Sequence, residues 1–229
     1  MKAIILAAGY GKRLRPLTET TPKPLIEVGG KPLIQYHLEN LADAGVKDVV
    51  INVHWLADRL IDTLGDGTDF GLQIRWSRET ELLETGGGIR NALPMLGNAP
   101  FLLVNGDVYF DYSLLSLVQR SLAESLAHLV LVPNPEHHHK GDFCVDDEQR
   151  LSRTDSNNDY TYAGAALIDP KLFDNLPSEP AAFPLLSPLL SALQKGLLTG
   201  EVHTGLWEDV GTIERLNALN QTLLSHTRD

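Results

Sequence analysis

Short apolar runs that alternate with helical patterns constrain the fold of this chain more than any other feature. The runs at 48–53 (DVVINV) and 101–105 (FLLVN) have the character of central strands, which are covered on both faces. Between them, residues 32–44 repeat apolar side chains along one helical face, with Pro32 suited to the first turn and Gly45 to the stop. This alternation predicts an α/β fold with an open, mainly parallel sheet between two layers of helices.

The other segments continue this pattern. We expect a helix over 57–64, strands over 73–77, 126–132, 160–168 and 200–203, and a final helix that starts after Thr212. No repeat, linker or low-complexity tract interrupts the sequence, so residues 1–229 are predicted to form a single domain.

Composition limits the class of protein. A hydrophobic content of 43% in 229 residues can bury one sizeable core, and no apolar run approaches the roughly 18 residues that span a bilayer. An acidic pI near 5.1 argues against nucleic-acid binding. The single cysteine, Cys144, excludes an internal disulfide and is expected to be a small buried residue rather than a nucleophile. We expect a soluble cytoplasmic protein without a signal peptide that binds neither nucleic acid nor membrane.

The first 25 residues carry a local excess of positive charge. The apolar run 3–8 leads directly into Gly9, Gly11, Lys12 and Arg13, and glycine amides can form an anion-binding nest. Lys23 adds a cation from a segment stiffened by prolines on both sides. Because the whole chain has a net charge of −11, this reversal predicts a polyphosphate site. The glycines alone are also consistent with an ordinary turn beside solvated cations.

Two common phosphate-binding motifs do not match. The dinucleotide-binding fingerprint needs a third glycine where this chain has Leu14, and no P-loop string follows the first strand. The complete string does match another pattern, L-A-A-G-x-G-x-R followed by P-K-P, at 6–9, Gly11, Arg13 and 22–24. The chain thereby resembles the sugar-1-phosphate nucleotidyltransferases.

This resemblance covers essentially the whole chain and implies a Rossmann-like α/β/α sandwich with a mixed, mainly parallel sheet. It also implies that residues 1–110 mainly bind the nucleotide and residues 111–229 mainly bind the sugar phosphate. It implies catalytic roles for Arg13, on the departing phosphates, and for Lys23, on the reacting phosphates. In this first motif, the nucleotide-binding residues that the resemblance implies are Leu6, Ala7, Ala8, Gly9, Gly11, Lys12, Arg13 and Lys23.

Two aspartates follow predicted strands, in Asn105-Gly106-Asp107 and in the W-x-D-x-G-T string at 207–212. Taken alone, Asp107 could cap a turn and Asp209 could interact with a helix dipole. Both strings match the same transferase family, which implies that Asp107 and Asp209 hold Mg²⁺. Carboxylate oxygens suit this ion in phosphoryl and nucleotidyl transfer.

The glycine-rich string 83–88 precedes a helical pattern. It could be a flexible loop, but a helix that begins there would offer free N–H groups to a ligand. The resemblance implies that Glu84, Thr85, Gly86 and Gly87 contact the nucleobase and ribose.

The sugar-facing residues are defined less sharply. Asn105, Gly141, Asp142 and Gly164 fall where the family closes over the sugar phosphate, although a turn and a glycine-relieved strand explain the last three equally well. The run His137 to His139 lacks the spacing of a zinc site, so we expect a solvated loop, with substrate contact as the alternative.

Within the family, the LETGGGI, VNGD and WxDVGT strings most resemble the branch that joins UTP to N-acetylmuramate α-1-phosphate. The implied partners are UTP and a sugar 1-phosphate, and we expect a monomer or a weak homo-oligomer. Two alternatives within the family are GTP with mannose 1-phosphate, and UTP or dTTP with glucose 1-phosphate. A catalytically silent nucleotide-binding regulator is the alternative from a different class.

Overall fold

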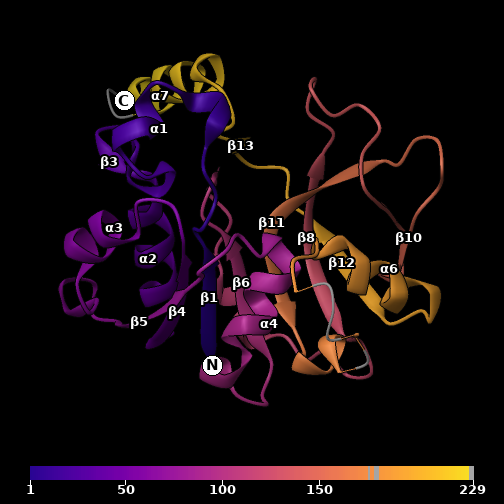
Figure 1. Ribbon diagram of the computed structural model, residues 1–229. Coiled ribbons are helices and arrows are strands. Elements are labelled where there is room, and N and C mark those ends of the chain that lie inside the picture. Colours follow the sequence, from indigo (N-terminus) through magenta and orange to yellow (C-terminus); the bar gives the residue numbers. More distant parts are fainter. Residues whose placement is uncertain (175, 178–180, 227–229) are drawn as a thin grey trace.

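The computed structural model describes residues 1–174, 176–177 and 181–226. Its centre is a seven-stranded sheet in the order β12-β8-β11-β6-β1-β4-β5 (Figure 1). In that order the strands are Leu198–Val202, Ala127–Pro133, Tyr160–Ile168, Phe101–Asn105, Lys2–Leu6, Asp48–Val53 and Gln73–Arg78. All neighbouring pairs are parallel except the two that β11 makes with β6 and β8. The predicted mixed, mainly parallel sheet is therefore confirmed.

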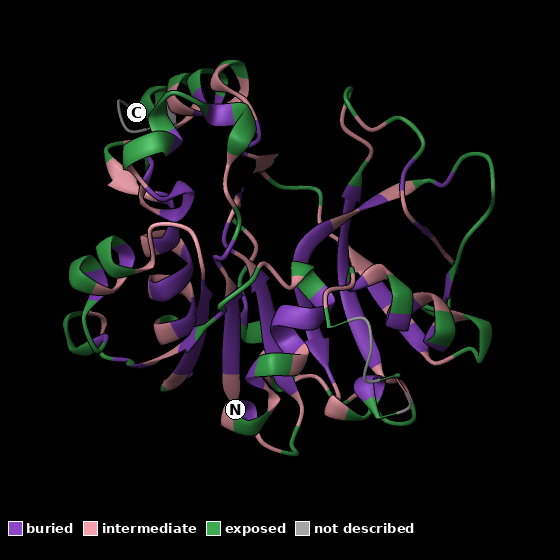
Figure 2. Cartoon of the chain, in the orientation of Figure 1, coloured by how far each residue is buried: buried purple, intermediate pink, exposed green. Residues whose placement is uncertain are grey.

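Helices cover both faces of this sheet, which explains why its strands are continuously apolar. Successive residues of β1 face two different cores, with Ala3 and Ile5 in one and Ile4 in the other. The first core is closed by α2 (Leu33–Asp43), α3 (Ala57–Leu64) and α5 (Leu115–Gln119), and the second by α4 (Glu84–Leu96) and α6 (Leu186–Gln194). Figure 2 shows the central strands almost wholly buried between exposed outer helix faces.

The two ends of the chain meet in a third, smaller core. The C-terminal helix α7 (Ile213–His226) contacts the N-terminal segment that contains the short helix α1 (Leu17–Thr20), where the N–H of Gly29 donates to Oδ1 of Asn220 at 2.7 Å. Leu216 and Leu219 of α7 pack with Leu14 and Val210, so the helix covers the segment that follows β1. The strand before α7, β13 (Trp207–Asp209), pairs with β7 (Val108–Phe110). The remaining strands are β2 (Glu27–Val28), β3 (Lys31–Pro32), β9 (Cys144–Val145) and β10 (Leu151–Ser152).

The predicted strands at 48–53, 101–105 and 160–168 are confirmed at both ends. The first strand is shorter than predicted, because after Leu6 the N–H of Ala7 donates to the side chain of Asn52 instead of to a neighbouring strand. Pro32 precedes α2 as its N-cap residue rather than lying in its first turn. The strand expected at 200–203 begins two residues earlier, at Leu198.

The structure also bears on two expectations from composition. Within the described residues, no helix is long and apolar enough to cross a membrane. Cys144 is half-buried, and burial raises the pKa of its thiol, which disfavours the reactive thiolate.

A polar cluster connects the outer strand β12 to residues on either side of the helix α5. Glu201 accepts hydrogen bonds from the hydroxyl of Tyr112 and from Arg120, whose Nη2 lies 2.6 Å from Oε2. The side chains of His128, Tyr112 and Arg120 together lower the pKa of Glu201 from 4.5 to about 2, against the opposing effect of burial.

We therefore expect Glu201→Gln to lower the free energy of unfolding by about 3 kcal/mol at pH 7. The folded state binds its proton less readily than the unfolded state, so this contribution is present above pH 4.5 and is lost as the pH falls towards about 2. Urea unfolding at pH 7, 4.5 and 3 measures the difference between wild type and variant. A difference that stayed constant across this range would contradict the assignment.

Candidate active site

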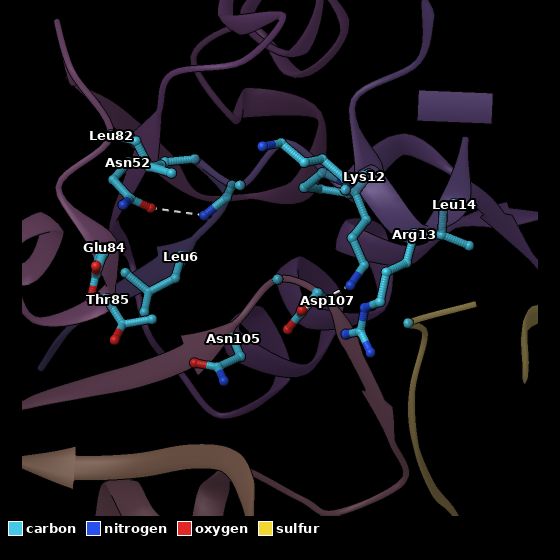
Figure 3. Close-up of a pocket in the computed structure, with 18 of the residues that line it drawn as sticks. Leu6, Lys12, Arg13, Leu14, Asn52, Leu82, Glu84, Thr85, Asn105 and Asp107 are labelled. Atoms are coloured by element: carbon cyan, nitrogen blue, oxygen red, sulfur yellow. Dashed lines mark hydrogen bonds and ion pairs between the residues drawn. The ribbon is translucent and has the colours of Figure 1, made fainter. Parts of the chain in front are cut away.

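A cavity of about 590 Å³ opens where the carboxyl ends of β1, β4 and β6 meet (Figure 3). This is the edge at which open α/β sheets bind ligands. Its walls come mainly from the first half of the chain, but two lining residues come from the second half. The lining residues are Leu6, Ala7, Ala8, Gly9, Gly11, Lys12, Arg13, Leu14, Lys23, Pro24, Asn52, Leu82, Glu84, Thr85, Asn105, Gly106, Asp107, Pro184 and Gly211.

The segment after β1 forms one wall. Gly11 adopts a left-handed backbone with φ of 62°, and a Cβ atom there would lie 2.7 Å from Cγ2 of Thr18. The hydroxyl of Thr18 donates to the carbonyl of Gly11 at 2.8 Å and fixes this turn. Gly9 has open space where a Cβ would be, so its backbone is accessible to a ligand. The exposed guanidinium of Arg13 makes no hydrogen bond or ion pair with the described residues.

Lys23 and Asp107 form an ion pair across the cavity. The ammonium Nζ lies 2.8 Å from Oδ2 of Asp107, and Figure 3 marks this contact. The side chain of Lys23 is 10% exposed and that of Asp107 is 48% exposed. The lysine is therefore held in a fixed position by its surroundings, whereas the carboxylate is open to solvent and to a ligand.

Two buried residues that the sequence analysis did not select support the cavity. Asn52 accepts a hydrogen bond from the N–H of Ala7 at 2.8 Å and donates to Glu79 at 2.7 Å. The other carboxylate oxygen of Glu79 accepts from the N–H of Leu83 at 3.0 Å. These hydrogen bonds connect the segment after β1, which forms one wall of the cavity, to the start of α4. A polar residue inside an otherwise apolar strand, as in DVVINV, is the sequence signal that could have identified Asn52.

The expectation that Gly86 and Gly87 offer free N–H groups is wrong. Both N–H groups donate to the carbonyl of Phe183, at 2.9 and 3.1 Å. A Cβ atom on Gly86 would overlap the ring of Phe183, and one on Gly87 would overlap the carbonyl of Ala181. These glycines thus allow residues 181–183 to pack closely on α4, and neither is among the residues that line the cavity.

Glu84 and Thr85 do line the cavity, as Figure 3 shows. Glu84 has φ of 58°, which is an unfavourable conformation for a residue with a side chain. The hydroxyl of Thr85 accepts a hydrogen bond from the N–H of Leu185 at 2.8 Å. The segment around Pro184 therefore lines the cavity beside Thr85. The sequence analysis did not predict this contribution.

Asp209 lies next to the cavity wall rather than on the wall itself. The N–H of Val210 donates to the carbonyl of Asp107 at 2.9 Å, so β13 and β7 bring both predicted metal ligands to the same end of the ladder. The carboxylate of Asp209 is paired with Arg215 and lies 2.9 Å from Nε2 of His137. Its oxygen also forms a compact group with potential ligand atoms of His137 and Glu208. Burial and the Asp209 charge raise the pKa of Glu208.

The predicted sugar-side residues divide into two groups. Asn105 lines the cavity, and Gly164 lies directly behind it, with φ of 84° at the bulge of β11. Gly141 has φ of 59° and is packed against Asn134, while Asp142 accepts from the N–H of Tyr162 at 2.9 Å. Neither Gly141 nor Asp142 is among the lining residues. The N–H of Gly141 donates to the carbonyl of His138 in a turn, whereas Asp142 contacts the strand β11.

The histidine run makes contacts that a fully solvated loop would not make. His137 and His139 are exposed, but His137 reaches Asp209, and Nε2 of His138 lies 3.2 Å from Oδ1 of Asp142. The loop is thereby connected to the strand that carries a predicted metal ligand.

The fold and this cavity define an α/β protein with a ligand site at the carboxyl edge of a mainly parallel sheet. The site combines a glycine-rich backbone with three cationic side chains and two carboxylates. The profile of the family described as Nucleotidyl transferase matches residues 2–226. The chain belongs to this family and is a nucleotidyltransferase.

Three comparisons show how similar the relatives are. The N-acetylmuramate alpha-1-phosphate uridylyltransferase of Neisseria meningitidis is 46% identical over 222 residues, which cover 94% of this chain and 95% of that protein. The mannose-1-phosphate guanyltransferase of Kluyveromyces lactis is 32% identical over 96% of this chain, which spans 66% of that enzyme. A Bacillus anthracis structure, provisionally named a glucose-1-phosphate thymidylyltransferase in complex with a sucrose, has a TM-score of 0.87 over 97% of this chain and 95% of that one. Its sequence identity is 24%, so it supports the fold alone.

Proposed function

We propose that this enzyme joins UTP to N-acetylmuramate α-1-phosphate and releases UDP-N-acetylmuramate and pyrophosphate. The observation that carries the proposal is the 46% identity to the Neisseria uridylyltransferase over nearly the full length of both chains. The matched length matters because the fungal guanyltransferase extends well beyond the part that this chain covers.

The proposed reaction is an in-line displacement. A phosphate oxygen of the sugar phosphate forms a bond to the α-phosphorus of UTP, and the bond from that phosphorus to the bridging oxygen breaks as pyrophosphate leaves. The attacking oxygen is already anionic at neutral pH, so catalysis consists mainly of alignment and charge stabilisation. Lys23, fixed at the cavity wall, would contact the α-phosphate and the attacking phosphate, and Arg13 would contact the departing phosphates.

Mg²⁺ is the proposed cofactor, with Asp107 and Asp209 as its protein ligands. Their hard carboxylate oxygens suit this ion, Asp107 is half-exposed in the cavity, and the paired strands bring both residues to one end of the ladder. When bound, the ion would neutralise charge on the phosphate oxygens. We further propose that the enzyme acts in the cytoplasm, in the recycling of peptidoglycan sugars.

A substrate panel with pyrophosphate detection tests the proposal. We expect UTP with N-acetylmuramate α-1-phosphate to give the highest kcat/KM, compared with GTP and mannose 1-phosphate and with UTP or dTTP and glucose 1-phosphate. A higher value for another pair would replace the proposed substrates. An absence of magnesium-dependent turnover with every pair would favour the nucleotide-binding regulator.

A further inference from the structure

The side chain of Arg215 lies beside the cavity and has no role in the proposed mechanism. It projects from the first turn of α7, and its side chain is 16% exposed. Its Nη1 donates to the carboxylate of Asp209 and lies 2.7 Å from Nε2 of His137. The other terminal nitrogen of the guanidinium, Nη2, lies next to Gly211 instead.

Nη2 of Arg215 points to the cavity wall at Gly211. A Cβ atom at Gly211 would collide with Nη2 of Arg215 and would lie 3.0 Å from Nη2 of Arg13. The two Nη2 atoms are therefore less than about 6 Å apart, since each lies within 3.0 Å of the same point. Gly211 itself lines the cavity, so two guanidinium groups from opposite ends of the chain converge on its wall.

Packing fixes this convergence. Leu14, which follows Arg13, and Leu216, which follows Arg215, are both buried in the third core together with Val210. The backbone at each arginine is thus held by a neighbouring leucine. Like charges at this separation repel each other, and Asp209 compensates only Arg215. The excess positive charge at Arg13 makes this part of the wall suited to a multiply charged anion, and the planar forks of arginine match phosphate oxygens.

We propose that Arg215 acts with Arg13 as a second ligand of the leaving pyrophosphate. This inference rests on the proposed function, since it assigns Arg215 to the phosphates that depart from the nucleotide. It makes Arg215 a catalytic residue that contacts substrate through Nη2, in addition to its contact with Asp209 through Nη1. The alternative is a positioning role, in which Arg215 only orients Asp209.

Titration calorimetry with inorganic pyrophosphate in EDTA separates these roles. We expect Arg215→Ala to weaken pyrophosphate binding by about 10- to 100-fold and Arg215→Lys by less, while UMP binding stays within about twofold. Arg150→Ala is the matched control, because it also removes an arginine from an ion pair, on the exposed surface with Glu148. Urea unfolding of each variant verifies that the protein is folded.

Arg215→Ala also leaves the carboxylate of Asp209 without its ion pair, and repulsion by this carboxylate could itself weaken pyrophosphate binding. A second pair of variants separates the two effects. Comparing Asp209→Asn with the double variant Asp209→Asn/Arg215→Ala removes the effect of the carboxylate, and we expect the same loss of pyrophosphate affinity between them. Pyrophosphate affinity within twofold of the parent protein in both comparisons would overturn the inference. A loss of UMP affinity as large as the loss of pyrophosphate affinity would also overturn it. Neither binding measurement requires the correct sugar, so a different preferred substrate pair would overturn the proposed function and leave this test unaffected.

Discussion

Lys23→Ala is expected to lower kcat/KM for pyrophosphate release by about 10²- to 10³-fold, the usual cost of removing one preorganised electrostatic group. The side chain of Lys23 is 10% exposed, and its ammonium is held 2.8 Å from the carboxylate of Asp107. A cation in this position needs no reorganisation when the two phosphates meet. A water molecule in place of the ammonium would carry no charge. The loss would therefore destabilise the transition state more than the bound substrates, and the rate would fall.

The fold should tolerate this change. Removing Lys23 leaves the carboxylate of Asp107 half-exposed, where water can solvate it, so we expect a loss of about 1 kcal/mol in the free energy of unfolding. Lys31→Ala is the matched control, because Lys31 forms an ion pair with Glu39 and does not line the cavity. A continuous pyrophosphate assay and urea unfolding measure both effects. Turnover at the wild-type rate in Lys23→Ala would exclude the proposed role of this lysine.

The central fold was predictable from the sequence because its strands are buried on both faces. A strand such as β4 has no solvent side, so it appears as an apolar run whose ends coincide with the ends of the strand. The order of the strands was not predictable in this way. The reversed direction of β11 and the pairing of β13 with β7 depend on contacts between residues that are far apart in the sequence.

The same distinction applies to the site. The glycines and cations of the first segment could be selected from the sequence because they are neighbours along one turn after a strand. By contrast, the contact of Phe183 with Gly86 and Gly87 joins residues about a hundred positions apart. The exposed glycine N–H groups expected from the local pattern are satisfied by a segment whose sequence shows no sign of this partner.

Arg215 illustrates a further limit. From the sequence alone, a charged residue in the first turn of a helix would be expected on the surface. The core that contains Leu14 and Leu216 instead brings Arg215 beside Arg13. Charge clusters within one segment are visible in a sequence, whereas a cluster assembled from both ends of the chain becomes visible only in the folded structure.

Asp107→Asn is expected to reduce kcat/KM by a similar factor, about 10²- to 10³-fold, but for a different reason. Lys23 is unaltered in this variant, and the proposed Mg²⁺ loses a charged ligand. We therefore expect the magnesium concentration that gives half-maximal rate to rise, which Lys23→Ala should not produce to the same extent. Measuring the initial rate across a magnesium titration for both variants distinguishes the two roles.

The stability of this variant should also differ from that of Lys23→Ala. In Asp107→Asn the ammonium of Lys23, which is nine-tenths buried, loses its counter-ion, so the free energy of unfolding should fall by about 1–3 kcal/mol. The double variant Asp107→Asn/Lys23→Met removes the buried charge and should recover part of this loss. Asp111→Asn is the control, since Asp111 pairs with His203 at 2.7 Å and does not line the cavity. An unchanged magnesium dependence in Asp107→Asn would exclude Asp107 as a metal ligand. An undiminished stability would show that the ion pair with Asp107 does not stabilise the buried ammonium of Lys23.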